Sequence, residues 1–237
     1  MALMFAYDPP TANATLEVQT WMQSEPPAPY WALVDVALVG SDRFKATARR
    51  HRWTPVNALA NTPLQAFGEV APHLIAISEV PQQRTAQIEQ LLRLTAGTPA
   101  LSWLRSAYPE PALQMLFGYL AKAQVQERPK PVHLRFADTR ILPGLLQTLS
   151  PTQYRRVLDI VQGWRWFARS GEWQTGPIEP VSVDAAEMDS ETHLRLSTEQ
   201  FDQLLADAEA DGVFYRLMLE HPVLVPPQQR AAFHQRL

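Results

Sequence analysis

Residues 132–149 constrain the fold most, because the spacing of their apolar side chains changes from two residues to three or four across a charged corner. Val132, Leu134 and Phe136 alternate with polar residues, as expected for a strand that buries one face. Asp138 and Arg140 then stand at the turn. The apolar residues that follow repeat at helical spacing: Ile141, Leu142, Leu145, Leu146 and Leu149. The segment predicts a strand, a charged corner and a helix that packs back on a sheet.

Similar changes of apolar spacing recur before and after this segment. Apolar or alternating runs predict further strands at 30–39, 55–60, 73–78, 101–107 and 163–169. Periodic runs predict helices at 13–24, 41–51, 86–96, 111–126 and after Pro151, with Ser41 and Asp42 capping the second. Strands joined by helix-length crossovers imply parallel pairs. The predicted fold class is therefore α/β, with a mixed sheet flanked by helices in an N-terminal lobe.

The chain changes character after the strand at 163–169. Ser170 and Gly171 predict a hairpin that completes the N-terminal lobe, residues 1–175. Residues 176–192 are rich in Pro, Glu, Asp and Ser and predict a linker or a long loop. Residues 193–237 predict a small α-helical C-terminal lobe, in which Ser197 and Gln200 form a capping box. Asp211 and Gly212 are expected to break its first helix.

Composition excludes several functional classes. The net charge of −3 gives no general attraction for nucleic acid or an anionic membrane. Cysteine is absent, which removes disulfides, thiol catalysis and thiolate metal sites. The N-terminus has no basic region before an apolar one, and the longest apolar run is too short for a membrane helix. We therefore expect a cytoplasmic protein.

Four charged residues are expected to converge at the ends of central strands: Asp35, Arg135, Asp138 and Arg140. A partly buried ion-pair network is the favoured interpretation, because buried charges require partners. An active site is the alternative, but no phosphate loop, nucleophile elbow or zinc motif accompanies these residues. The six histidines also lack the spacing of metal ligands. We predict no catalytic residue, no metal and no cofactor.

Two groups of apolar residues are candidates for binding a protein partner. The first is the aromatic hairpin, with Trp164, Trp166 and Trp173, although large aromatic residues also pack cores. The second group lies in the C-terminal lobe: Phe201, Leu204, Leu205, Phe214 and Leu217. These residues are too few to close a large core, so spare apolar surface is expected there. A basic segment from Arg43 to Arg52 predicts a solvated helix face.

The corner resembles the signature of a bacterial family of type VI secretion effector adaptor chaperones of the Tap/TEC type. Arg135, Phe136, Asp138 and Arg140 match its Arg-Phe-aromatic-Asp-Pro-Arg run, whereas alanine stands at 137 and threonine at 139. Residues 30–35, 71–75 and 101–106 resemble the family's earlier strands in the same order. The resemblance covers roughly residues 28–170.

The resemblance implies a non-catalytic adaptor that binds a toxic effector and loads it onto the VgrG spike, without being exported itself. The implied partners are therefore the effector toxin and the VgrG spike protein. A small enzyme, either a transferase or a hydrolase, that uses the cluster of Asp35, Arg135, Asp138 and Arg140 is an alternative. An immunity protein is another.

Overall fold

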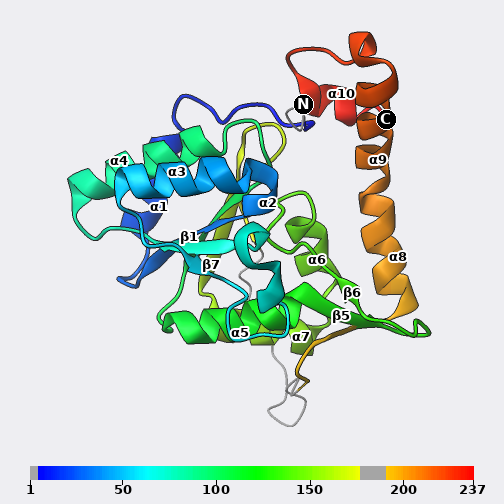
Figure 1. The fold of residues 1–237 in the computed structure, drawn as a ribbon, viewed down its shortest axis with the longest axis horizontal. Helices are drawn as coiled ribbons and strands as arrows, with labels where there is room; N and C mark the ends of the chain where they lie inside the picture. The colour runs from blue at the N-terminus through cyan, green and yellow to red at the C-terminus, as the bar shows by residue number, and fades with distance from the viewer. Residues whose placement is uncertain (1–4, 177–190) are drawn as a thin grey trace.

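The computed structural model describes residues 5–176 and 191–237. Its larger sheet has six strands in the order β2-β3-β1-β4-β7-β8. In that order they are Val56–Asn57, His73–Ala76, Tyr30–Val34, Leu101–Arg105, Gly163–Phe167 and Trp173–Thr175. The α/β class and the helices flanking the sheet are confirmed (Figure 1).

The expected parallel pairs within this sheet are wrong, because all of its paired strands are antiparallel. The helical crossovers do connect strands that run in the same direction, β1 to β2 and β3 to β4. In each case a strand of opposite direction lies between the two: β3 between β1 and β2, and β1 between β3 and β4. Spacing along the chain predicted the helical crossovers but not that another strand lies between the two strands that each crossover joins.

Each face of the sheet carries its own helices and its own core (Figure 1). Ala32 and Val34 point to the face covered by α1 (Ala14–Ser24), α3 (Ser41–His51) and α4 (Pro81–Leu94). Leu33 and Leu104 pack in the other core, with helices α5 (Glu110–Ala121), α6 (Leu142–Thr148) and α7 (Pro151–Ile160). The alternation of side chains along β1 thus divides the interior into two apolar layers.

The structure also contains a second, smaller sheet, and two predicted elements differ from the prediction where they join it. Its order is β6-β5-β9, with β6 at Val132–His133, β5 at Lys122–Val125 and β9 at Leu194–Leu196. The helix expected over 111–126 ends at Ala121, because the chain changes directly into β5. The strand expected at 132–136 has only two residues, although burial still alternates through Leu134 and Phe136. β5 and β9 form a parallel pair, so this sheet is mixed.

The strand expected at 30–39 ends at Val34, because Asp35 caps a short helix, α2 (Val36–Val39). Its carboxylate accepts a hydrogen bond from the N–H of Ala37 at 3.1 Å. The next helix, α3, follows Gly40, which has a φ of 93°, and its first turn has no side-chain cap from Ser41 or Asp42. An apolar run of strand-like composition therefore divides at its single charged residue.

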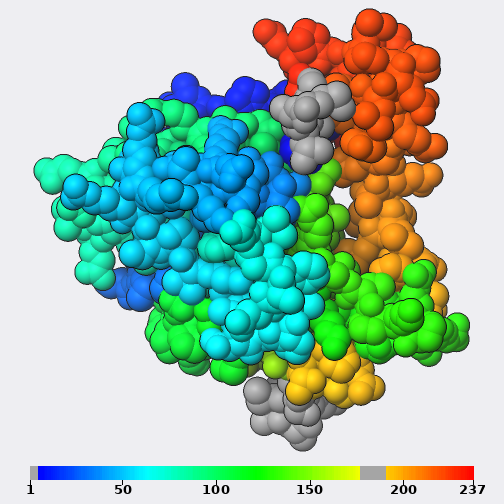
Figure 2. Space-filling view, viewed as in Figure 1, coloured from blue at the N-terminus to red at the C-terminus, as the bar shows by residue number. Residues whose placement is uncertain are grey.

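The C-terminal helices form a column along one side of the molecule (Figure 2). The predicted capping box of Ser197 and Gln200 is confirmed at the start of α8 (Thr198–Asp207). The break falls at Ala208, before α9 (Glu209–Glu220), and not at Asp211 and Gly212. η3 (Pro222–Leu224) and α10 (Arg230–His234) complete the lobe. Most of the predicted linker, 176–192, lies outside the described residues.

No helix in the described parts of the chain is both long enough and apolar enough to span a membrane.

Candidate functional site

Asp138 and Arg140 form a tightly bonded corner between β6 and α6. The Asp138 carboxylate, 1% exposed, accepts hydrogen bonds from the backbone N–H of Arg140 at 3.0 Å and from its Nη2 at 2.6 Å. Between them, the N–H of Thr139 donates to the carbonyl of Pro99 at 2.9 Å. The Thr139 hydroxyl also lies 2.8 Å from the hydroxyl of Tyr7, whose pKa burial raises to about 12. These bonds hold the corner against the start of β4 and against the N-terminal segment.

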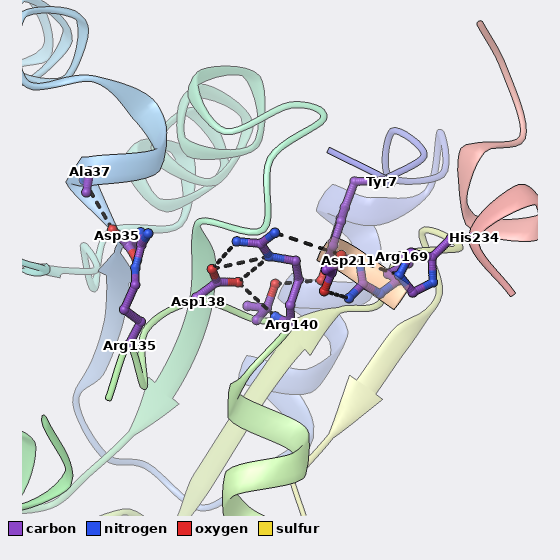
Figure 3. A network of polar contacts seen from close by, with 10 residues as sticks. Tyr7, Asp35, Ala37, Arg135, Asp138, Arg140, Arg169, Asp211 and His234 are labelled. Carbon is purple, nitrogen blue, oxygen red and sulfur yellow. Dashed lines mark hydrogen bonds and ion pairs between the residues drawn. The ribbon is translucent and has the colours of Figure 1, made fainter. Parts of the chain in front are cut away.

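Asp35 and Arg135 form a second, separate pair. Arg135 Nη2 lies 2.9 Å from Asp35 Oδ2, and the two side chains are 40% and 4% exposed, respectively. Burial raises the pKa of Asp35, and the charge of Arg135 opposes that rise. The four charged residues therefore lie near one another, as Figure 3 shows, but each arginine neutralises a different aspartate.

A cavity of about 210 Å³ opens beside the Asp35–Arg135 pair. Its walls are mainly apolar and include Phe67 and Val70, both exposed, on η1 (Gln65–Val70). His133 also lines it, and its ring is tilted against that of Phe67 with the centroids 4.8 Å apart. Burial lowers the pKa of His133, which favours a neutral imidazole.

Asp211 and its partner Arg169 were not among the site residues identified from the sequence. Asp211 lies in the first turn of α9 and receives both terminal nitrogens of Arg169, at 2.9 and 2.5 Å. Arg140 Nη1 lies 3.8 Å away, and His234 Nε2 lies 3.4 Å away. Figure 3 shows these groups meeting around one carboxylate. Asp211 thus joins the C-terminal column to the signature corner and to the end of β7.

Phe136 and two of the tryptophan candidates belong to the core below the corner. The ring of Phe136 stacks on that of Phe117, with their centroids 5.0 Å apart. The ring of Trp164 contacts Phe117 as well, at a centroid distance of 6.0 Å. The indole N–H of Trp164 donates to the hydroxyl of Ser102 at 3.0 Å. Trp166 is buried in the same core. In this structure these aromatic rings contact the protein's own interior.

Trp173 is half-buried at the outer end of the hairpin. Its ring lies 4.8 Å from that of Phe167 and 6.0 Å from that of Trp21 on α1. The hairpin, which forms one edge of the sheet, therefore also packs against the first helix, α1.

The C-terminal candidates separate into buried and exposed residues. Phe201, Leu204 and Phe214 are buried, and Leu217 is half-buried. Leu205 is 50% exposed. Four further apolar residues of the column are exposed and were not predicted from the sequence: Tyr215, Leu219, Val223 and Leu224. Tyr215 and Leu219 are four residues apart on α9, so they lie on one helix face.

The predicted solvated face of α3 is confirmed. Arg43, Arg49 and Arg50 are exposed, as is Arg52 just beyond the helix. Lys45, on the same helix, forms an ion pair with Glu69.

The carboxylates of Asp35 and Asp138 both have hydrogen-bond partners within the protein. These partners are arginine side chains and backbone N–H groups. Within residues 5–176 and 191–237, no three His, Asp or Glu residues come close enough to hold a metal ion.

Residues 30–156 match a protein family described as "Domain of unknown function (DUF4123)". No curated protein and no solved structure matches the chain.

Proposed function

This chain belongs to the DUF4123 family, and we propose that it is a non-catalytic adaptor chaperone of type VI secretion. In this role it binds a toxic effector and loads it onto the VgrG spike. The family match over residues 30–156 falls within the stretch, roughly 28–170, that resembles such adaptors. Arg135, Phe136, Asp138 and Arg140 lie inside both.

The observation that carries the proposal is that the charged side chains at and around the corner pair with one another. Asp138 is neutralised by Arg140, and Asp211 is neutralised by Arg169. Arg140 also lies 3.8 Å from Asp211, so the two pairs connect the corner, the end of β7 and the first turn of α9. Such pairing suits a scaffold that fixes the relative position of two lobes, because an adaptor must hold two partners in a defined arrangement. Partner binding then falls to surfaces outside the corner.

We assign effector capture to the C-terminal lobe and spike contact to the N-terminal lobe. Tyr215 and Leu219 are 52% and 48% exposed on one face of α9, and Leu205 is 50% exposed on α8. Apolar residues on one helix face are a common means of gripping a partner's helix. The sheet lobe offers a rigid base for the spike.

Co-purification tests both parts of the proposal. The full chain is expected to hold the products of a neighbouring toxin gene and a neighbouring spike gene together. Tyr215→Glu combined with Leu219→Glu should abolish effector capture, spare spike capture and leave the fold intact, because surface substitutions cost little stability. Met115→Glu is a matched control, since Met115 is an exposed apolar residue on α5.

An intact protein that holds neither partner would exclude the adaptor function. An immunity protein would bind the toxin but not the spike, so the same experiment separates these two functions. Full effector capture by the double variant would contradict only the assignment of lobes.

A small enzyme is the second candidate, because Asp35 has a raised pKa and lines a cavity beside His133. Perturbed carboxyl groups in cavities are common at active sites. Elemental analysis and a thermal-shift screen with nucleotides test this candidate. We expect no stoichiometric metal and no large stabilisation, and either result would favour the enzyme instead.

A further inference from the structure

Among the residues that the structure describes, part of one edge of the large sheet has no partner strand. β2 has only two residues and pairs with His73 and Leu74 of β3. Ala76, at the end of β3, therefore has β1 on one side and, within residues 5–176 and 191–237, no strand on the other. Ala76 is also exposed, although it lies between buried residues.

The hydrogen-bond pattern shows which way the groups of Ala76 point. The N–H of Ile77 donates to the carbonyl of Tyr30 on β1 at 2.9 Å. Because the bonds of an antiparallel ladder alternate, the N–H and carbonyl of Ala76 must point away from β1, toward the open edge. Groups in that orientation are a template for pairing with another chain.

A side chain of α4 takes the place of the missing strand. The buried amide of Gln87 donates through Nε2 to the carbonyl of Ala76 at 2.9 Å. Its Oε1 accepts a hydrogen bond from the N–H of Ser78, also at 2.9 Å. A glutamine amide has the same donor and acceptor as a peptide group. A main-chain segment can therefore exchange with it bond for bond.

A groove of about 490 Å³ lies directly over this edge. Its floor runs along β3 from Ile75 to Ser78, and one wall is a single face of α4: Gln83, Ala86, Gln87 and Gln90. The other wall is the segment from His51 to Thr54, which diverges from β3 before β2 begins. The groove thus continues the line of β2 beyond Val56.

The charge of the groove indicates what it accommodates. Its lining contains Arg52 and no carboxylate. Arg49 and Arg50, both exposed, follow one another in the last turn of α3, next to this wall. An extended segment with acidic side chains matches this surface better than a neutral or basic one.

We propose that the edge of β3 at Ala76 binds an extended, acidic segment of a partner protein by strand addition. The segment lies in the groove between α4 and residues 51–54 and displaces the amide of Gln87. It bonds to the N–H and carbonyl of Ala76 and to the N–H of Ser78. This inference deepens the proposed adaptor function and rests on it only for the identity of the partner.

The test uses the full chain and a labelled synthetic peptide in which glutamate alternates with valine. A peptide with lysine in place of glutamate is the charge control. Ala76→Pro removes the outward N–H without breaking a bond to β1, since proline is tolerated at such edge positions. Ala76→Val keeps the N–H and is the matched control.

We expect the wild type and Ala76→Val to bind the acidic peptide, and the lysine peptide to bind much more weakly. Ala76→Pro should weaken binding about tenfold or more, the effect of losing one hydrogen bond. In the wild type, the peptide should slow hydrogen exchange at the amide of Ala76.

Equal binding by a folded Ala76→Pro variant would overturn the inference, as would equal binding of the lysine peptide or no binding of the acidic one. If the proline variant does not fold, unchanged exchange at Ala76 in the wild type overturns it. Failure of the wild type to co-purify with effector and spike would instead refute the adaptor function. Those two failures are therefore distinguishable.

Discussion

Replacing Asp138 with alanine is expected to destabilise the protein by about 3 kcal/mol, because it leaves Arg140 charged without its main partner. Breaking a buried ion pair typically costs about 3–5 kcal/mol. The lower end applies here, because the Arg140 side chain is 19% exposed and keeps Asp211 at 3.8 Å. The variant also loses the acceptor for the N–H of Arg140 at the turn.

Urea denaturation followed by circular dichroism measures this change as a shift of the midpoint at constant slope. Combining Asp138→Ala with Arg140→Met should recover much of the loss, since the double variant buries no unpaired charge. Asp159→Ala is the matched control: its exposed pair with Arg155 on α7 should contribute only about 0.5 kcal/mol. If Asp138→Ala is as stable as this control, the corner is not a structural network.

Three further predictions concern other parts of the molecule. Asp35→Asn should change the free energy of unfolding by less than about 1 kcal/mol. Burial raises the pKa of Asp35, its partner Arg135 is partly exposed, and asparagine can still cap α2. A loss of stability as large as that of Asp138→Ala would contradict this prediction. Gly118→Ala should lower the free energy of unfolding by about 1–3 kcal/mol in thermal or urea denaturation, because the new Cβ would lie 2.6 Å from the Thr62 side chain. Gly144→Ala should cost less, because its new Cβ comes closest to the movable carboxylate of Asp207. Burial lowers the pKa of His234, so the neutral imidazole contributes its full stability above pH about 6.5 and loses it as the pH falls below this value. The urea midpoint of the wild type should therefore decline as the pH is lowered through this range. The decline should be smaller in His234→Gln.

Local signals in the sequence predicted where several of the helices begin. Ser197 and Gln200 form the expected capping box because both of its hydrogen bonds lie within one turn. The leading helix, expected at 13–24, is α1 at Ala14–Ser24. Such features depend on residues that are neighbours in the chain, so the sequence alone contains the necessary information.

The order of the strands could not be read in the same way. Nothing near β3 in the chain indicates that it enters between β1 and β2, because that position depends on contacts between distant segments. Residues 30–39 also have the composition of a single strand, but the strand ends at Asp35, whose carboxylate caps α2 and also pairs with Arg135, one hundred residues away. The strand order therefore depends on tertiary contacts that local propensity does not contain.

The same limit applies to the candidate site. Asp35, Arg135, Asp138 and Arg140 were all identified from the sequence, because charges next to apolar runs require partners. Their division into two pairs was not predicted. Asp211 was interpreted only as part of a helix break, since its partner Arg169 lies 42 residues earlier and belongs to a different element.

The contacts of the C-terminal lobe determine how the chain can be dissected. Leu194 and Leu196 on β9 and Phe201 and Leu204 on α8 are part of the same core as Leu104 of the central sheet. A truncation near residue 190 would expose that core and is expected to unfold the N-terminal lobe.

A truncation after Ala208 keeps β9 and α8 and removes α9, whose Phe214 belongs to a separate, small cluster with Ala6 and Val225. This shorter chain should retain the near-ultraviolet circular dichroism of the buried tryptophans. It should lose effector capture if α9 makes the contact. Loss of that signal would mean that contacts of residues 209–237, such as the pair of Asp211 with Arg169 or the packing of Phe214, are required for the whole fold. Point variants on the surface of α9 would then be the valid test of the lobe assignment.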